Sequence, residues 1–448
     1  MIVNNHISNY FFIGIGGIGM SALARYFNSL GKTVMGYDRT DSELTAKLSE
    51  EGIHVVYIEE EAEELMYALD QKSTLLVYTP AVQIKSRLIQ LAQKEKFQLI
   101  KRAALLGEIT ASKKTLAVAG THGKTTTSAL LTHLLKVADE KVTAFLGGIL
   151  LSENSNFIHQ GDEVVVVEAD EFDRSFLHLH PNLAVITSTD ADHLDIYKTE
   201  QALEESFELF STQVSETLFV AEELKLKGIK YGFSELAEVQ AFNIQVKKGS
   251  YYFDIVYQDM LLKGLQLKLP GKHNLANAIA ALALAINFNK DKAHLYAKAL
   301  ASFSGVKRRF NYLYQSAKLT LIDDYAHHPT EISAAHQAAR EMHPGEDVMV
   351  IFQPHLYSRT ENFATNFARS LQQFDEICIL EIYPAREDPI LGVNAQFLID
   401  KIEHKNKKII EKSDLLKSIK ETNCAIVLFL GAGDIGEEAI KIKEALCV

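Results

Sequence analysis

The 448-residue sequence is poor in cysteine, in excess positive charge and in long apolar runs, and each shortage excludes a class of protein. Its three cysteines, Cys378, Cys424 and Cys447, are odd in number and have no metal-ligand or CxxC spacing. A disulfide framework is therefore excluded, and a reducing cytosol is expected. Lys and Arg number 46 against 58 Asp and Glu, which gives a formal net charge of −12. We expect no nucleic-acid partner and no binding to anionic membranes.

The longest clean apolar run, 278–286, is about half as long as the roughly 18 residues that suggest a membrane span. The first 24 residues contain no Lys or Arg, and glycines interrupt their apolar stretch, which is not typical of a signal peptide. We therefore expect a soluble, cytoplasmic protein.

Hydrophobic residues make up 47% of the chain and charged residues 23%, the balance of an ordinary globular protein. At about 150 residues per domain, the length predicts about three domains. Short apolar runs alternate with longer amphipathic segments, a pattern typical of parallel sheets flanked by helices. The sequence predicts an α/β protein of three domains, each with a mostly parallel sheet: residues 1–108, 109–308 and 309–448.

The expected strands are short apolar runs at 10–15, 33–37, 75–78, 115–119, 163–167, 183–187, 319–322, 348–352, 377–382 and 425–430. Expected helices include 18–30, 125–137 and 276–287. Residues 217–270 differ, because apolar and polar residues alternate at 251–257; this predicts an antiparallel β insertion or edge.

A first glycine-rich loop lies between an expected strand and an expected helix. It has the G-x-G-x-x-G glycines Gly14, Gly16 and Gly19, with Asp38 at the end of the next strand. Such glycines let backbone N–H groups approach a diphosphate at a helix N-terminus. The motif alone favours NAD(P) or FAD. The alternative is that the glycines serve only close strand–helix packing.

A second glycine loop follows the strand at 115–119 and has the sequence Gly120, Thr121, His122, Gly123, Lys124, Thr125 and Thr126. The general phosphate-loop pattern has a further glycine at position 118, where this chain has Val. The loop amides and Lys124 suit the β- and γ-phosphates of a nucleotide, and Thr125 suits Mg²⁺.

Acidic residues follow two expected strands at the edge where ligands of parallel sheets bind. They are Glu168, Asp170 and Glu171 after one strand, and Asp190, Asp192, His193 and Asp195 after the other. Carboxylates beside a phosphate loop favour Mg²⁺. His193 is either a ligand of that ion or a surface histidine.

The last third of the chain adds basic and aromatic residues at strand ends. Arg308 and Arg309 lie in the expected hinge, and loops at 323–329 and 353–360 carry histidines and Arg359. Each loop taken alone is also explained as an ordinary polar loop without a ligand. The two loops together favour an anionic or zwitterionic ligand. Two nucleotide-type loops suit an enzyme that uses ATP on a second, nucleotide-linked molecule. A nicotinamide oxidoreductase leaves the second loop unexplained, and an ATP-gated binding protein is a non-catalytic alternative.

The motifs GIGGIGM, GTHGKTT, EADEFD, DADHLD, GKHNLAN, RRF, DDYAHHPTEI and QPHLYSRT occur in this order along nearly the whole chain. In these motifs the chain resembles the Mur ligases, most of all the members that join L-alanine to UDP-N-acetylmuramate. The resemblance implies a Rossmann-like first domain for UDP, a central domain for ATP, and a Rossmann-like third domain for the amino acid and ATP.

The implied reaction passes through an acyl phosphate and gives UDP-N-acetylmuramoyl-L-alanine, ADP and phosphate for peptidoglycan synthesis. The implied UDP-substrate residues are Gly14, Gly16, Gly17, Gly19, Met20 and Asp38. ATP would contact residues 120–126, Asn274 and Asn277, and metal would bind Thr125, Glu168 and His193. The implied catalytic residues are Lys124, Glu168, His193, Arg308 and Arg309, and L-alanine would meet Tyr325, His327, His328 and Arg359.

Two features of this resemblance leave alternatives open. The recycling ligase that joins UDP-N-acetylmuramate to a tripeptide shares the central motifs. Several sister ligases hold a second Mg²⁺ with a carbamoylated lysine, but residues 204–208 of this chain contain no lysine. The expected assembly is a monomer or homodimer.

Overall fold

The computed structural model describes residues 6–82, 85–190, 197, 199–247, 249–385 and 387–447. The chain divides into two compact units. The first comprises Met1–Phe242, Asp254–Lys263 and Asn277–Phe303, and the second Asn243–Phe253, Gly264–Ala276 and Ser304–Val448.

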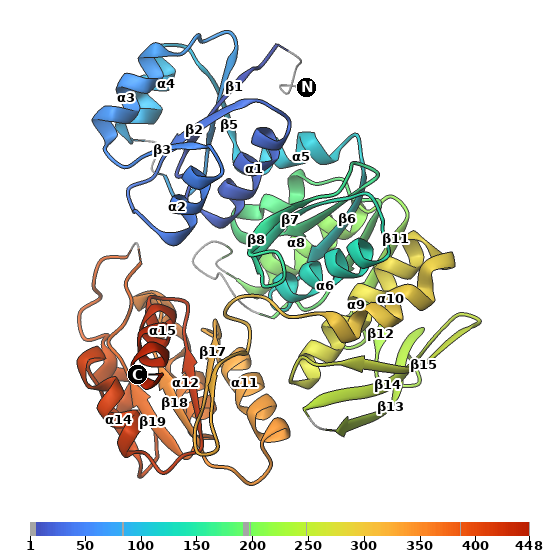
Figure 1. Ribbon diagram of the computed structural model, residues 1–448, viewed down its shortest axis with the longest axis vertical. Coiled ribbons are helices and arrows are strands. Elements are labelled where there is room, and N and C mark those ends of the chain that lie inside the picture. The colour runs from blue at the N-terminus through green and yellow to red at the C-terminus, as the bar shows by residue number, and fades with distance from the viewer. Residues whose placement is uncertain are drawn as a thin grey trace. The chain divides into compact units, whose positions relative to one another are not determined.

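The N-terminal sheet has five parallel strands in the order β3-β2-β1-β4-β5, drawn in blue in Figure 1. The strands are β1 (Asn9–Ile13), β2 (Thr33–Tyr37), β3 (His54–Val56), β4 (Thr74–Tyr78) and β5 (Gln98–Lys101). The helices are α1 (Ile18–Ser29), α2 (Glu43–Glu50), α3 (Glu59–Ala68), α4 (Arg87–Lys94) and α5 (Arg102–Thr110). Ser42 caps α2 and Ser86 caps α4 by accepting hydrogen bonds from backbone N–H groups, so local sequence sets where these helices begin.

The central sheet has ten strands in the order β15-β14-β13-β12-β11-β10-β6-β9-β7-β8. Its first half contains β6 (Lys114–Ala119), α6 (Lys124–Val137), β7 (Val142–Leu150), β8 (Ser155–His159), β9 (Val164–Ala169), the 3₁₀ segment η1 (Phe172–His178), β10 (Leu183–Ile186) and α8 (Glu200–Thr212). Central strands such as Val164–Val167 are fully buried, which explains their continuous apolar sequence.

The second half contains β11 (Thr217–Ala221), β12 (Ile229–Gly232), β13 (Val239–Lys247), β14 (Ser250–Tyr257), β15 (Met260–Leu267), α9 (Lys272–Phe288), η2 (Lys290–Lys292), α10 (Ala293–Ala299) and η3 (Leu300–Ser302). The antiparallel prediction for 217–270 is wrong for its first part, because β11, β12 and β13 continue the parallel pairing from β10. Beyond them β14 and β15 complete one edge of the sheet. Only Gln258 and Asp259 join these two strands, and such a short connection requires a hairpin.

The C-terminal sheet has six strands in the order β16-β17-β21-β18-β19-β20, with β16 antiparallel to β17 and the other pairs parallel. Its elements are β16 (Asn311–Gln315), β17 (Thr320–Asp324), α11 (Pro329–Met342), β18 (Val348–Phe352), α12 (Tyr357–Leu371), β19 (Glu376–Ile379), α13 (Ala395–Ile399), β20 (Lys407–Ile409), η4 (Lys412–Asp414), α14 (Leu415–Glu421), β21 (Ile426–Leu430) and α15 (Ile435–Leu446). The predicted α/β architecture is confirmed. Among the described residues, no helix is long and apolar enough to cross a membrane.

Within the first unit, α1 packs against β7 and β8 of the central sheet. Asn156 of β8 is fully buried there, and its amide donates to the hydroxyl of Ser21 at 3.0 Å and to the carbonyl of Ile18. Arg25 of α1 donates to the side-chain Oδ1 of Asn156 and, at 2.6 Å, to the carboxylate of Glu51. A buried polar network thus fixes the helix that follows the first glycine loop against the central sheet.

Candidate active site

The second glycine loop joins β6 to α6 and takes a conformation that only glycine adopts easily. Gly120 has φ +132° and Gly123 has φ +81°. A Cβ at Gly120 would lie 2.1 Å from the Thr187 hydroxyl oxygen, so backbone space as well as φ requires glycine. Lys124 is the first residue of α6. The backbone N–H groups of the loop and the N-terminus of the helix therefore lie together, an arrangement that suits an anion.

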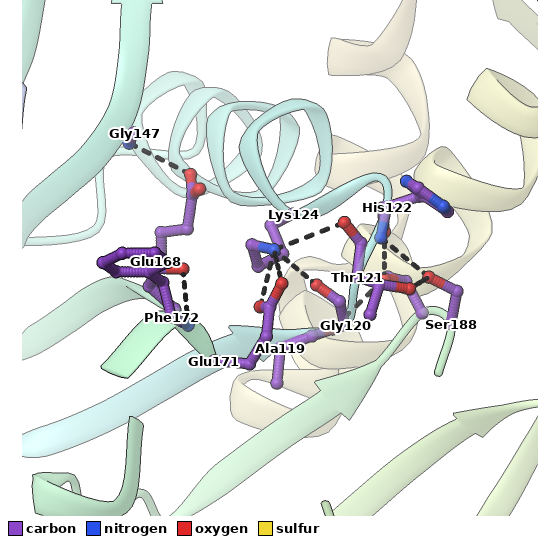
Figure 2. Close-up of polar contacts among 12 residues, drawn as sticks. Ala119, Gly120, Thr121, His122, Lys124, Gly147, Glu168, Glu171, Phe172 and Ser188 are labelled. Carbon is purple, nitrogen blue, oxygen red and sulfur yellow. Dashed lines mark hydrogen bonds and ion pairs between the residues drawn. The ribbon is translucent and has the colours of Figure 1, made fainter. Parts of the chain in front are cut away.

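Lys124 is held by the carboxylate of Glu171, which follows β9 (Figure 2). Its Nζ donates to the two Glu171 oxygens at 2.9 and 2.7 Å and to the Gly120 carbonyl at 2.6 Å. Burial opposes the charge of Lys124, but Glu171 and two neighbouring carboxylates outweigh burial and raise its pKa. The loop lysine is therefore held in place as a positive charge by the protein's own carboxylates.

Glu168 bridges the helix that carries Lys124 and strand β7. The Thr125 hydroxyl donates to its Oε1 at 3.1 Å. The Gly147 N–H donates to Oε2 of Glu168 at 3.0 Å (Figure 2). A Cβ at Gly147 would lie 2.4 Å from both carboxylate oxygens, so glycine permits this approach. A hydroxyl and a carboxylate beside a phosphate loop are hard oxygen donors that fit Mg²⁺.

Residues after β10 complete the wall of the loop. The Ser188 hydroxyl accepts from the His122 N–H at 2.7 Å and lies 2.8 Å from the Thr121 hydroxyl. His122 Nε2 lies 3.5 Å from a carboxylate oxygen of Asp190. Because β10 and β9 flank β6 in the sheet, residues far apart in sequence meet at the carboxyl end of β6.

Both asparagines predicted to contact ATP lie on α9 and are almost fully buried. Asn277 lies against the loop, since a Cβ at Gly123 would come within 2.4 Å of its Oδ1. The side chain of Asn274 donates to the Pro270 carbonyl at 2.6 Å.

The first glycine loop, between β1 and α1, is held by its own acidic residue. The Gly16 N–H donates to Asp38 Oδ2 at 2.8 Å, and the Thr40 N–H donates to Asp38 Oδ1 at 3.1 Å. Gly14 has φ +86° and donates to the Tyr37 carbonyl. Met20 is 1% exposed in the hydrophobic core. The structure thus places Gly14, Gly16 and Asp38 together, with Met20 beneath them rather than on the surface.

In the second unit, the side chain of Arg308 contacts residues at the ends of strands in the C-terminal sheet. It donates to the carbonyls of Gly431 and Gly433 and lies 3.5 Å from buried Asp323. Burial raises the pKa of Asp323, and Arg308 opposes that rise. Arg308 and Arg309 both lie over the ring of Tyr325, at 5.2 and 5.3 Å from its centre.

The two histidines after β17 are fixed by Glu331. Its Oε2 accepts from the N–H groups of His327 and His328 at 3.0 and 3.2 Å and caps α11. The His327 ring lies edge-on to Tyr325 and to His355, with centres 5.2 and 6.0 Å apart. Arg359 is buried in the first turn of α12. The structure therefore gathers Arg308, Arg309, Tyr325 and His327 into one aromatic and cationic cluster.

His193, predicted as a catalytic residue and metal ligand, lies outside the described residues, as do Asp192 and Asp195. Among the described residues there is no group of three or more His, Cys, Asp or Glu side chains that could hold a metal. Mg²⁺ does not need one, because it commonly binds one or two carboxylates together with substrate phosphates.

The chain matches three family models in order. They are "Mur ligase family, catalytic domain" over residues 9–114, "Mur ligase middle domain" over 118–285, and "Mur ligase, glutamate ligase domain" over 308–433. It is also 53% identical to the UDP-N-acetylmuramate–L-alanine ligase of Christiangramia forsetii over 446 residues, which cover 99% of this chain and 98% of the relative. The chain belongs to the Mur ligase family.

Solved structures of Mur ligases agree with this. The UDP-N-acetylmuramate–alanine ligase MurC of Thermotoga maritima aligns with a TM-score of 0.83 and 30% identity, covering 98% of this chain and 99% of that one. The murein peptide ligase of Psychrobacter arcticus aligns with a TM-score of 0.70 over 98% of both chains, but at 20% identity this likeness concerns the fold alone. The resemblance inferred from the sequence motifs is confirmed.

The Mur ligase motifs did not reveal what Glu171 and Ser188 do. Both lie beside residues singled out in the sequence, Glu171 within the acidic group after β9 and Ser188 just before Asp190. Their contacts with Lys124 and the loop depend on the strand order β10-β6-β9, which the sequence does not reveal. The acidic motif itself was the one available signal for Glu171.

Proposed function

We propose that this Mur ligase joins L-alanine to the lactyl carboxylate of UDP-N-acetylmuramate at the expense of ATP. The observation that carries the proposal is 53% identity, over 99% of the chain, to a UDP-N-acetylmuramate–L-alanine ligase. Lys124 and the Thr125–Glu168 pair beside it support the proposal chemically, because a lysine ammonium and two hard oxygen donors lie together at a glycine loop.

In the first step, a lactyl carboxylate oxygen bonds to the γ-phosphorus, the bond to the β-phosphate oxygen breaks, and ADP leaves. The carboxylate is already ionised at neutral pH, so this step needs no general base. Its barrier comes from bringing an anion to a polyanion, which fixed positive charge lowers. Lys124 supplies such a charge, and Mg²⁺ held by Thr125 and Glu168 would neutralise phosphate oxygens when bound.

In the second step, the alanine amine bonds to the acyl carbon and the phosphate leaves with the oxygen that joined it. The amine loses a proton in the process. We assign the amino-acid site to Tyr325, His327, His328 and Arg359, with Arg359 pairing the alanine carboxylate. Arg308 and Arg309 are assigned to the phosphorylated intermediate, and His193 to a second metal position.

The further assignments follow the same reasoning. The loop at Gly14, Gly16, Gly17 and Gly19 would hold UDP, and Asn274 and Asn277 the adenine. We propose three domains with boundaries near 108 and 308, and the cytoplasm as the location, where ATP and UDP-linked precursors are available. The assembly is proposed to be a monomer or homodimer.

The test is to incubate the chain with UDP-N-acetylmuramate, ATP and Mg²⁺, and to offer L-alanine, L-serine, glycine or the tripeptide separately. ADP release and product mass are measured. We expect the L-alanine adduct, with some serine or glycine product, because one methyl group discriminates by only about 1–3 kcal/mol. Turnover with the tripeptide and none with L-alanine would replace this function by the recycling reaction.

A further inference from the structure

Arg102 lies between Gly19 and the carboxylates at the carboxyl end of β9. It is the first residue of α5 and is half-buried. A Cβ at Gly19 would lie 3.0 Å from Arg102 Nη1 and 3.4 Å from its Cζ, so the guanidinium lies against Gly19, the second residue of α1. A side chain at position 19 would press against this cation and require it to shift slightly.

On its other side, Arg102 lines a small pocket with Glu168 and Asp170. Ser175 and the apolar side chains of Leu106 and Phe176 form more of its wall. Glu168 is the carboxylate that the Thr125 hydroxyl contacts. One pocket therefore connects the guanidinium beside the first loop with the acidic edge of the phosphate loop, and all of these residues belong to the first compact unit.

The local structure keeps Arg102 in this position. Helix α5 packs against η1, where a Cβ at Gly107 would come within 2.4 Å of the His178 carbonyl oxygen. The neighbouring Lys101 lies 3.7 Å from Asp173 in the same segment. The close helix contact and this ion pair fix the start of α5 beside the carboxylates.

Within the described part of the chain, no hydrogen bond or ion pair engages the Arg102 guanidinium. Arg25, another arginine of the same unit, is in contrast paired with Glu51 and hydrogen-bonded to Asn156. A half-buried guanidinium with no anionic partner among the described residues keeps its N–H donors available to an anion. The Arg102 guanidinium is thus free to pair with an anionic group that enters the pocket.

We propose that Arg102 binds anionic oxygens of the UDP-linked substrate as that substrate runs from the first glycine loop toward the phosphate loop. The inference rests on the proposed function. Two groups of the substrate offer the required chemistry, the diphosphate and the lactyl carboxylate, and a guanidinium fork binds either one through two hydrogen bonds. Arg102 would then keep the acid close to the γ-phosphate while offsetting the negative charge of both.

The test measures binding of UDP-N-acetylmuramate, UDP-N-acetylglucosamine and UDP by calorimetry, without ATP. For Arg102→Ala we expect affinity to fall about 10- to 100-fold, the value of a lost charge-assisted contact. An equal loss for all three ligands assigns Arg102 to the diphosphate. A loss for UDP-N-acetylmuramate alone assigns it to the carboxylate, which the other two ligands lack.

Arg87→Ala is the matched control, because it removes an exposed arginine of α4 that pairs with Glu60 and Glu63. It should bind all three ligands like the unaltered protein. Arg102→Lys keeps the charge but not the forked guanidinium, so its affinities should lie between those of Arg102→Ala and those of the unaltered protein. This variant also tests the proposal if Arg102→Ala does not fold. Unchanged affinity for all three ligands in a folded Arg102 variant would overturn the proposal. If the unaltered chain binds these ligands yet makes no alanine adduct, the proposed function fails instead.

Discussion

The two glycine loops of the first unit begin alike and end differently. Each follows a buried parallel strand and opens a helix. The loop at β6 supplies its own cation, Lys124, and holds it with buried Glu171. The loop at β1 has no lysine, and its Gly16 N–H is taken by Asp38. A strand–glycine–helix motif therefore says where an anion binds but not how its charge is neutralised.

The difference suits the two substrates proposed. A triphosphate that must accept an attacking anion needs a cation at the reacting phosphorus, which Lys124 provides. A UDP group only has to be held, and backbone N–H groups with a helix N-terminus suffice for that, with help from Arg102 at its reactive side. Substitutions in the two loops should therefore affect different measurements, chiefly ADP production for the loop at β6 and binding of UDP ligands for the loop at β1.

Lys124→Ala should have the largest effect. We expect ADP production to fall by at least about 10²- to 10³-fold, because the fixed charge at the phosphates is lost. UDP-N-acetylmuramate binding, measured by calorimetry without ATP, should be largely intact. Unchanged turnover would remove Lys124 from the mechanism, and loss of UDP-substrate binding would mean that the two loops are not separate.

Glu171→Gln tests whether the buried carboxylate holds Lys124 in place. The free energy of unfolding should fall by about 2 kcal/mol, the value of a hydrogen bond between charged groups, and ADP production should fall with it. Glu153→Gln is the control, since Glu153 pairs with Lys136 in a more exposed position. Such a pair should contribute under about 1 kcal/mol in denaturant unfolding. Equal effects of the two variants would contradict the role of Glu171.

A pair of glycine substitutions separates the loops by backbone geometry. Gly120→Ala should destabilise the protein by about 1–3 kcal/mol, because φ is +132° and the new Cβ meets Thr187 and Ser188. Gly17 has φ −63°, and its Cβ would meet nothing closer than 3.4 Å. Gly17→Ala replaces only an N-cap glycine and should destabilise the protein by less than about 1 kcal/mol in thermal unfolding. A Gly17→Ala protein destabilised as much as Gly120→Ala would show that the first loop is as constrained as the second.

Asp38→Asn should have the smallest effect. The amide oxygen can still accept from the Gly16 N–H, so stability should change by less than about 1 kcal/mol. Asp38→Ala removes the acceptor, so its free energy of unfolding should be about 1 kcal/mol lower than that of Asp38→Asn. Calorimetric binding of UDP alone gives a second measurement. A large loss of UDP affinity in Asp38→Asn, with stability intact, would show that the carboxylate contacts the ligand rather than only the loop.

The sequence predicted strands best where both faces are buried. The strand at 348–352 has the predicted bounds, and all of its residues are buried, because a continuous apolar run at this position is enclosed within the sheet's helical layers. The orientation of β11, β12 and β13 was missed, since alternation in a half-buried strand does not report the direction of its neighbour. Pairing within a sheet depends on contacts distant in sequence.

The same limit applies to the active site. Motif spacing predicted Lys124, Thr125 and Glu168 as site residues. The structure places them together, because the first two lie in one loop and the end of β9 brings the carboxylate. The contact of Glu171 with Lys124 depends on the turn after β9, where Asp173 and Arg174 both have positive φ. Arg102 was missed because nothing in its own sequence neighbourhood relates it to Gly19. Tertiary packing alone brings the two together.

The central claim is that the acid is activated by phosphoryl transfer before the amine attacks. UDP-N-acetylmuramate labelled with ¹⁸O in both lactyl carboxylate oxygens, incubated with ATP, Mg²⁺ and L-alanine, tests it directly. The account predicts one ¹⁸O atom in each inorganic phosphate released, read by mass spectrometry, and one remaining in the amide. Phosphate free of ¹⁸O, with the alanine adduct formed, would contradict it.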